Sequence, residues 1–119
     1  MDTIQHLLNM AAAQAIKKNT IDMRCFRIGS VGVRNDGAIV YSRNLSDTNR
    51  NRRIHSEYRL ARKLDFGAIV FVARVLRDGI TVGMARPCPD CERLLRQMKV
   101  RKVYYTIAPD EYGVLVLDQ

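Results

Sequence analysis

Four side chains in two short stretches have the types and spacing of a catalytic metal site. His55 and Glu57 stand in the first stretch, and Cys88 and Cys91 follow in Pro-Cys-Pro-Asp-Cys at residues 87–91. One imidazole and two thiolates supply three ligands for Zn²⁺, which leaves the fourth tetrahedral position open for water. A carboxylate beside that position can take a proton from the water and pass it to a substrate. The residue types therefore indicate hydrolysis at a zinc ion, with Glu57 as the proton carrier.

A closed structural zinc site is the alternative interpretation of the same ligands, and it needs a fourth protein ligand. His6 and Cys25 are the only other histidine and cysteine of the sequence, and neither has ligand-like spacing. Cys25 has strand-like neighbours, so we interpret it as a small buried apolar side chain. An odd number of cysteines without a signal peptide also argues against a disulfide framework.

The pattern H-x-E followed by P-C-x-x-C is the signature of zinc-dependent nucleobase deaminases. Over residues 27–107 the chain resembles the cytidine deaminase superfamily. The resemblance implies a three-layer α/β/α sandwich around a five-stranded mixed sheet, with Zn²⁺ on His55, Cys88 and Cys91. It also implies conversion of cytosine to uracil, in which Glu57 delivers protons to ring N3 and to the departing amine.

Four further residues are candidate substrate contacts. Ser56 stands where the family most often has alanine, and its backbone N–H can still face the reacting oxygen. In the resembling enzymes an asparagine before the histidine helix contacts the sugar, a role we carry to Asn44, although bonding to nearby backbone is equally open. Arg53 belongs to the basic loop that leads into His55, and Tyr105 can line the base pocket or pack in the core.

The composition predicts one globular domain over residues 1–119. Hydrophobic residues make up 47% and charged residues 27% of the chain, as in ordinary soluble domains. No apolar run approaches the roughly 20 residues that span a bilayer. The first ten residues lack a basic segment followed by an apolar one, so we expect no secretion signal, no membrane partner and a cytoplasmic location.

The net charge of +8 favours anionic partners such as phosphates or nucleic acid. The basic residues cluster along the chain, at Arg43, Arg50, Arg52 and Arg53, then Arg59, Arg62 and Lys63, and finally Arg93, Arg96, Lys99, Arg101 and Lys102. A solvated basic surface is the alternative interpretation. Aromatic residues amount to only 7%, with no tryptophan, so stacking platforms for single-stranded nucleic acid are few.

Hydrophobic periodicity and turn signals predict the elements that must position the site. Residues 3–18, 53–64 and 90–97 have helical patterns, and the last two carry the motif residues at their starts. Extended segments are expected within 23–44, divided by Asn35-Asp36-Gly37, and at 67–76, 103–107 and 114–117. Gly29 and Gly32 mark a bulge or a close approach to the first strand.

The last two strands should pair antiparallel, because the connection between them is too short for a crossover helix. Such a closing hairpin resembles the branch of free cytidine deaminases and some toxin deaminases. We therefore expect a deaminase of free cytidine, deoxycytidine or their nucleotides, and the resemblance implies a homo-oligomer. A cytosine or adenine deaminase acting on single-stranded DNA or RNA is the alternative. A zinc-containing binding protein without activity is the third interpretation, which the presence of Glu57 disfavours.

Overall fold

The computed structural model describes residues 3–17, 27–44 and 56–117. Their strands form one sheet in the order β2-β1-β3-β5-β6, and a short β4 pairs with β3. The helices are α1 (Thr3–Ala15), α2 (Ser56–Ala61) and α3 (Pro89–Gln97). The strands are β1 (Arg27–Val33), β2 (Ile39–Arg43), β3 (Ile69–Val75), β4 (Val82–Gly83), β5 (Lys102–Ala108) and β6 (Glu111–Val116).

The sheet is mixed, as predicted. β1 pairs antiparallel with both β2 and β3, while β3 and β5 pair in parallel around the connection that contains α3. β6 returns antiparallel to β5, which confirms the closing hairpin. The turn between them is tighter than expected, because Asp110 adopts a left-handed φ of 60° and β6 already begins at Glu111. The predicted five strands form the main path, and β4 is an addition to it.

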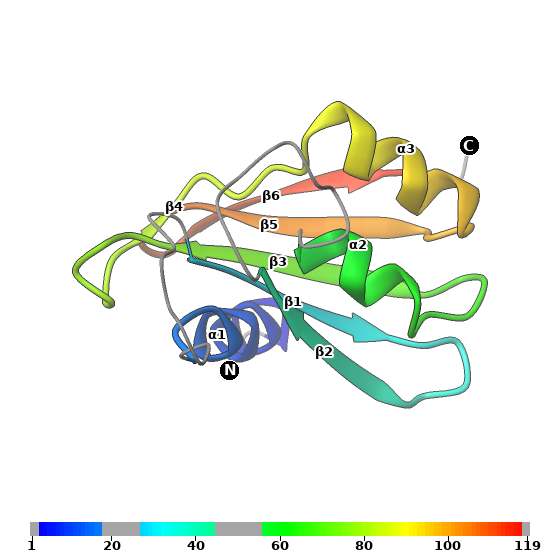
Figure 1. Ribbon diagram of the computed structural model, residues 1–119, viewed down its shortest axis with the longest axis horizontal. Coiled ribbons are helices and arrows are strands. Elements are labelled where there is room, and N and C mark those ends of the chain that lie inside the picture. Colours follow the sequence, from blue (N-terminus) through cyan, green and yellow to red (C-terminus); the bar gives the residue numbers. More distant parts are fainter. Residues whose placement is uncertain (1–2, 18–26, 45–55, 118–119) are drawn as a thin grey trace.

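Helices cover both faces of the sheet (Figure 1), which confirms the predicted α/β/α layers. On one face, α1 packs through Leu8 and Ala11 against Val31, Phe71 and Ala73. The opposite face carries α2 and α3, whose buried side chains join a second core with the other sides of the strands. That second core contains Leu60, Leu64, Ala68, Val70, Val72, Ala85, Leu95, Val100, Val103, Tyr105 and Leu117.

The two glycines of β1 allow these layers to approach closely, as the sequence predicts. A Cβ at Gly29 would lie 2.0 Å from the carbonyl oxygen of Ala11, so α1 rests directly on the strand backbone. Gly32 faces the other side, where a Cβ would lie 2.5 Å from Cδ2 of Leu64. β1 is therefore approached closely from both layers, by the backbone of α1 on one side and by the Leu64 side chain, which follows α2, on the other.

Two helix boundaries differ from the predicted ones. α1 ends at Ala15 and not at residue 18, which lies outside the described residues. α2 ends at Ala61, because the N–H of Lys63 bonds the carbonyl of Leu60 and tightens the chain into a turn. The predicted start of α2, at residues 53–55, also lies outside the described part of the chain.

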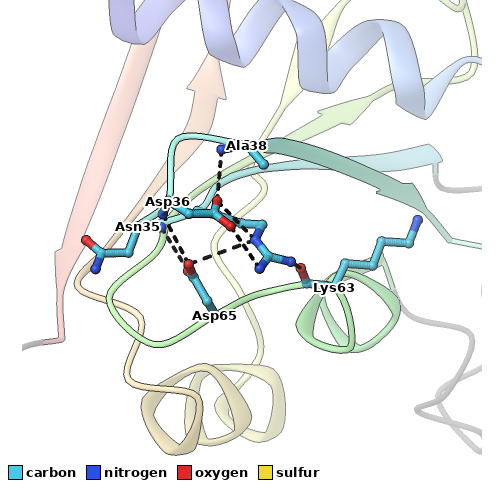
Figure 2. A network of polar contacts seen from close by, with 6 residues as sticks. Asn35, Asp36, Ala38, Lys63 and Asp65 are labelled. Carbon is cyan, nitrogen blue, oxygen red and sulfur yellow. Dashed lines mark hydrogen bonds and ion pairs between the residues drawn. The ribbon is translucent and has the colours of Figure 1, made fainter.

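A polar network fastens the β1–β2 turn to the segment that follows α2 (Figure 2). The carboxylate of Asp65 accepts the backbone N–H groups of Asn35 and Asp36 at 2.8 and 3.2 Å. Arg34 pairs with Asp36 at 3.1 Å and donates to the carbonyl of Lys63 at 3.1 Å. The end of α2 is thereby tied to the tip of the hairpin.

Candidate active site

Glu57 lies in the first turn of α2, as predicted, and its side chain is only 6% exposed. The helix is held on the sheet by Leu60, which is fully buried, and by the contact of Leu64 with Gly32. A six-residue helix has little stability of its own, so these tertiary contacts decide its orientation. The carboxylate is therefore presented by a short helix that the sheet holds in place.

The two cysteines lie at the start of α3. Cys88 is the residue that precedes the helix, with extended backbone (φ −65°, ψ 161°), and Pro89 fills the first turn. Proline suits that position because its missing N–H would have no partner there and its φ is already helical. Cys88 is exposed and Cys91 is buried. One turn of helix thus places two thiols near one another at different depths.

Glu57 and the two cysteines converge from α2 and α3. Burial raises the pKa of the Cys91 thiol, and the neighbouring Glu57 carboxylate and Cys88 thiol raise it further through charge and hydrogen bonding. A helix N-terminus by itself lowers the pKa of a thiol. The helix terminus is outweighed by loss of solvent and by two neighbouring acidic groups.

These groups fit a zinc ion. Two thiols and a carboxyl group collected in a poorly solvated place disfavour one another's charges, and a divalent cation reverses that balance and favours thiolates. Within residues 3–17, 27–44 and 56–117, no three histidine, cysteine or acidic side chains form a metal-binding group by themselves. The third predicted ligand, His55, lies outside the described residues, and so does Arg53.

Three buried serines adjoin this site, and no sequence pattern indicated that Ser30 and Ser42 belong to it. Ser30 of β1 and Ser42 of β2 are opposite one another in the β1–β2 register, and Ser56 opens α2. The hydroxyl oxygens of Ser30 and Ser56 are 2.6 Å apart, and Ser42 donates to the carbonyl of Ser56 at 2.5 Å. The side chain of Ser56 therefore points into the sheet and contacts the strands.

Asn44 ends the β1–β2 ladder. Its backbone N–H donates to the carbonyl of Ile28, and its side-chain Oδ1 accepts the N–H of Ile28, both at 3.0 Å. The sequence left two roles open for the Asn44 side chain, a contact with the sugar or a bond to nearby backbone. Its side-chain oxygen makes the backbone bond. The residue is buried at the end of β2, on the strand beside which α2 lies.

Tyr105 and its neighbour Tyr104 face opposite sides of the sheet. Tyr105 is 9% exposed in the core under α2 and α3, and its ring lies where a Cβ on Gly113 would approach to 2.6 Å. Tyr104 lies on the α1 side, stacked on Phe71 with ring centroids 5.2 Å apart. Of these two tyrosines, Tyr105 therefore lies in the layer that carries Glu57 and the cysteines.

Two basic side chains of the α2 region interact with the edge strand. Arg59 donates to the carbonyl of Arg43 at 2.6 Å, and Lys63 donates to the carbonyl of Tyr41 at 2.5 Å. Burial, and secondarily the charge of Arg43, lower the pKa of Arg59. These contacts occupy acceptors on the outer edge of β2, where another strand could otherwise add. Part of the basic cluster thus has a structural role.

The comparisons with known proteins agree with this geometry. The family model for the cytidine and deoxycytidylate deaminase zinc-binding region matches residues 1–107. Cytidine deaminase from Burkholderia pseudomallei is similar with a TM-score of 0.66 and 20% identity, over 98% of this chain and 94% of that one. Cytidine deaminase from Mycobacterium leprae is similar with a TM-score of 0.62 and 19% identity, over 98% and 95%.

The comparison with functionally curated proteins gives no significant match. In the described residues, no helix has both the length and the hydropathy to cross a membrane. The structural neighbours establish the fold, and the family model covers nearly the whole sequence, including the cysteine motif. The chain therefore belongs to the cytidine and deoxycytidylate deaminase family, and it is a zinc-dependent hydrolytic deaminase.

Proposed function

We propose that the chain deaminates the cytosine ring of free cytidine, deoxycytidine or a nucleotide of either, and releases uracil-containing product and ammonia. The observation that carries this function is the buried Glu57 carboxylate beside the Cys91 thiol, where α2 and α3 begin. A carboxylate in such a place can move a proton without competition from bulk water. The same placement suits the two proton transfers that deamination needs.

We assign the zinc ligands as His55, Cys88 and Cys91, with Glu57 outside the ligand set. When bound, the ion lowers the pKa of a water and makes it a nucleophile at neutral pH. Glu57 would carry one proton of the water to ring N3 as the oxygen adds to C4, and would then carry the second proton, from the hydroxyl formed at C4, to the amine that leaves as ammonia. The backbone N–H of Ser56 faces the reacting oxygen from the start of α2.

The remaining contacts are assigned to the substrate. Tyr105 supports the base from the layer below the site, and Arg53 approaches from the loop before α2. A sugar contact by Asn44 would use its amide nitrogen, since Oδ1 already accepts from Ile28. The closing β5–β6 hairpin supports a small substrate, and so do the two similar structures, which are cytidine deaminases. We further propose one domain, a homo-oligomer and a role in cytoplasmic nucleotide metabolism.

Deamination of cytosine or adenine in single-stranded DNA or RNA is the second candidate, and the net charge of +8 is what favours it. Two of the basic residues, Arg59 and Lys63, already bond the edge strand. These two side chains are held against β2, so fewer basic side chains can extend toward phosphates than the sequence suggests. The small-substrate function has the better support.

Ammonia release from a substrate panel tests the proposal. Zinc-loaded protein is incubated with cytidine, deoxycytidine, their monophosphates, adenosine, and short single-stranded DNA and RNA. Glu57→Gln removes the proton carrier, and Glu92→Gln in α3 is the matched control because Glu92 pairs with Arg96 at 3.6 Å. We expect release from a mononucleoside or mononucleotide that Glu57→Gln abolishes and Glu92→Gln retains. Release from oligonucleotides alone would select the second candidate.

A further inference from the structure

Three buried hydroxyl groups meet where α2 begins. Ser30 and Ser56 are 0% exposed and Ser42 is 5% exposed. They come from three separate elements, because β1, β2 and α2 each contribute one. The core on the same face of the sheet includes the apolar residues Ile28, Val40, Leu60 and Leu64. Such a polar group costs free energy unless every hydroxyl finds partners.

The observed distances give each hydroxyl proton an acceptor. Ser42 donates to the backbone carbonyl of Ser56 at 2.5 Å, and Ser56 donates in return to the carbonyl of Ser42 at 3.4 Å. The 2.6 Å contact between Ser30 and Ser56 is then a donation from Ser30. The Ser42 and Ser56 hydroxyl oxygens are also 3.2 Å apart. The network is closed and directional, and it attaches both the side chain and the carbonyl of Ser56 to the strands.

This attachment fixes the residue next to the proton carrier. Ser56 directly precedes Glu57 and follows His55 in the sequence. At its other end α2 is fastened by Leu64 against Gly32 and by the Asp65 network. Arg59 and Leu60 hold the later part of the helix, and the serines add the attachment of its first residue. A shift there moves the Glu57 carboxylate relative to Cys91 on α3.

We propose that Ser30, Ser42 and Ser56 are positioning residues, which hold the first turn of α2 on β1 and β2 so that Glu57 stays in register with the zinc-binding thiols. They touch neither substrate nor metal through their side chains and act through the backbone of Ser56. The catalytic part of this role rests on the proposed function, whereas the effect on metal retention does not.

Ser42→Ala is the most selective test, because it removes the donor to the Ser56 carbonyl and leaves the Ser30–Ser56 pair. Two quantities are measured on zinc-loaded protein: the rate of zinc transfer to the chelator 4-(2-pyridylazo)resorcinol, and kcat and KM for cytidine. We expect faster zinc loss and a lower kcat, each by roughly 10- to 100-fold, the usual effect of removing an outer support of a metal site. KM should stay nearly unchanged, because substrate contacts are retained.

Thr106→Val is the matched control for loss of a buried hydroxyl elsewhere. Thr106 is 3% exposed, donates to the carbonyl of Gly83 at 2.7 Å and accepts from the N–H of Arg74 at 3.2 Å. Thr106→Val should lower the thermal stability, while the rate of zinc transfer and kcat should stay close to those of the wild type. If Ser42→Ala behaves as this control does in both measurements, the positioning role is refuted.

A second variant covers the case in which Ser42→Ala does not fold. Replacing Ser30, Ser42 and Ser56 together by alanine leaves no hydroxyl without a partner, and such complete apolar replacement is well tolerated. This variant should fold, lose zinc quickly and turn over slowly, and wild-type behaviour would overturn the proposal. If the wild type fails to deaminate cytidine, the proposed substrate is wrong, and zinc transfer alone decides the positioning role.

Discussion

The two faces of the sheet are built differently. Under α1 lies an apolar cluster, in which the aromatic rings of Phe71, Tyr104 and Tyr112 pack together. Under α2 and α3 the apolar core includes the hydroxyl groups of the three serines, and it adjoins the Glu57 carboxylate and the Cys91 thiol. One face therefore gains stability from each buried side chain, whereas the other also buries polar groups that cost stability unless partnered.

This difference separates the origin of stability from the origin of function. The α1 layer needs no ligand to be complete. In the α2 and α3 layer, burial first and then the charges of Glu57 and Cys88 raise the pKa of Cys91. A bound Zn²⁺ supplies the opposite charge, so we expect this layer to depend on the metal and the α1 layer to be largely independent of it.

Zinc removal should have the largest effect and should act on one face. A ligand present at 1,000 times its Kd stabilises the folded state by about 4 kcal/mol, and a chelator removes that contribution. Amide hydrogen exchange should then quicken in α2 and α3 (residues 56–61 and 89–97) and change little in α1 (residues 3–15). Equal acceleration on both faces would contradict the proposed division between them.

Gly29→Ala should have the next largest effect, on the opposite face. The added Cβ would meet the backbone of Ala11 at 2.0 Å and of Ala15 at 2.5 Å, so α1 must move. We expect a loss of about 3 kcal/mol in the free energy of unfolding, at the upper end for overpacking. Denaturant unfolding measures the loss, and zinc affinity should stay near that of the wild type.

Gly79→Ala is the control for that substitution, since a Cβ there meets nothing within 4 Å and only the φ of 73° opposes it. It should cost about 1 kcal/mol, the usual cost of a left-handed conformation for a non-glycine residue. A similar loss in the two variants would show that α1 does not rest on β1 as described.

Asp36→Asn should have the smallest effect, and the effect should depend on pH. A hydrogen bond from the N–H of Ala38, and then the Arg34 guanidinium, lower the pKa of Asp36 below its ordinary 3.8. A carboxyl whose pKa is lowered by folding stabilises the protein above its unfolded pKa, and this contribution is lost as pH falls through the folded value. The wild type should melt slightly above the variant at neutral pH, and their melting temperatures should converge well below pH 3.8. If the difference in melting temperature persists in acid, the charge of the Asp36 carboxylate is not its cause.

Local signals in the sequence were sufficient for most of the fold. Asn35-Asp36-Gly37 marks a turn because Gly37 provides the positive φ of 92° that the turn requires. The apolar run after Gly67 became the central strand β3, and the short connection at Pro109 allowed only an antiparallel return. Such features depend on neighbouring residues alone, so the sequence carries them directly.

The site could be predicted less completely, because parts of it depend on register and depth. Ser30 and Ser56 are 26 residues apart, and they meet only because β1, β2 and α2 pack in one particular register. The raised pKa of Cys91 could not be predicted, since the sequence shows its helix terminus but neither its burial nor the nearby Glu57. The Asp65 network likewise joins groups about 30 residues apart.

X-ray absorption at the zinc edge, together with metal content, tests the central assignment most directly. The assigned ligands His55, Cys88 and Cys91 predict one zinc per chain. They also predict two sulfur neighbours at about 2.3 Å and two nitrogen or oxygen neighbours at about 2.0 Å, one of them an exchangeable water. Protein that binds no zinc, or zinc without sulfur neighbours, would contradict the site placed at the start of α2 and α3.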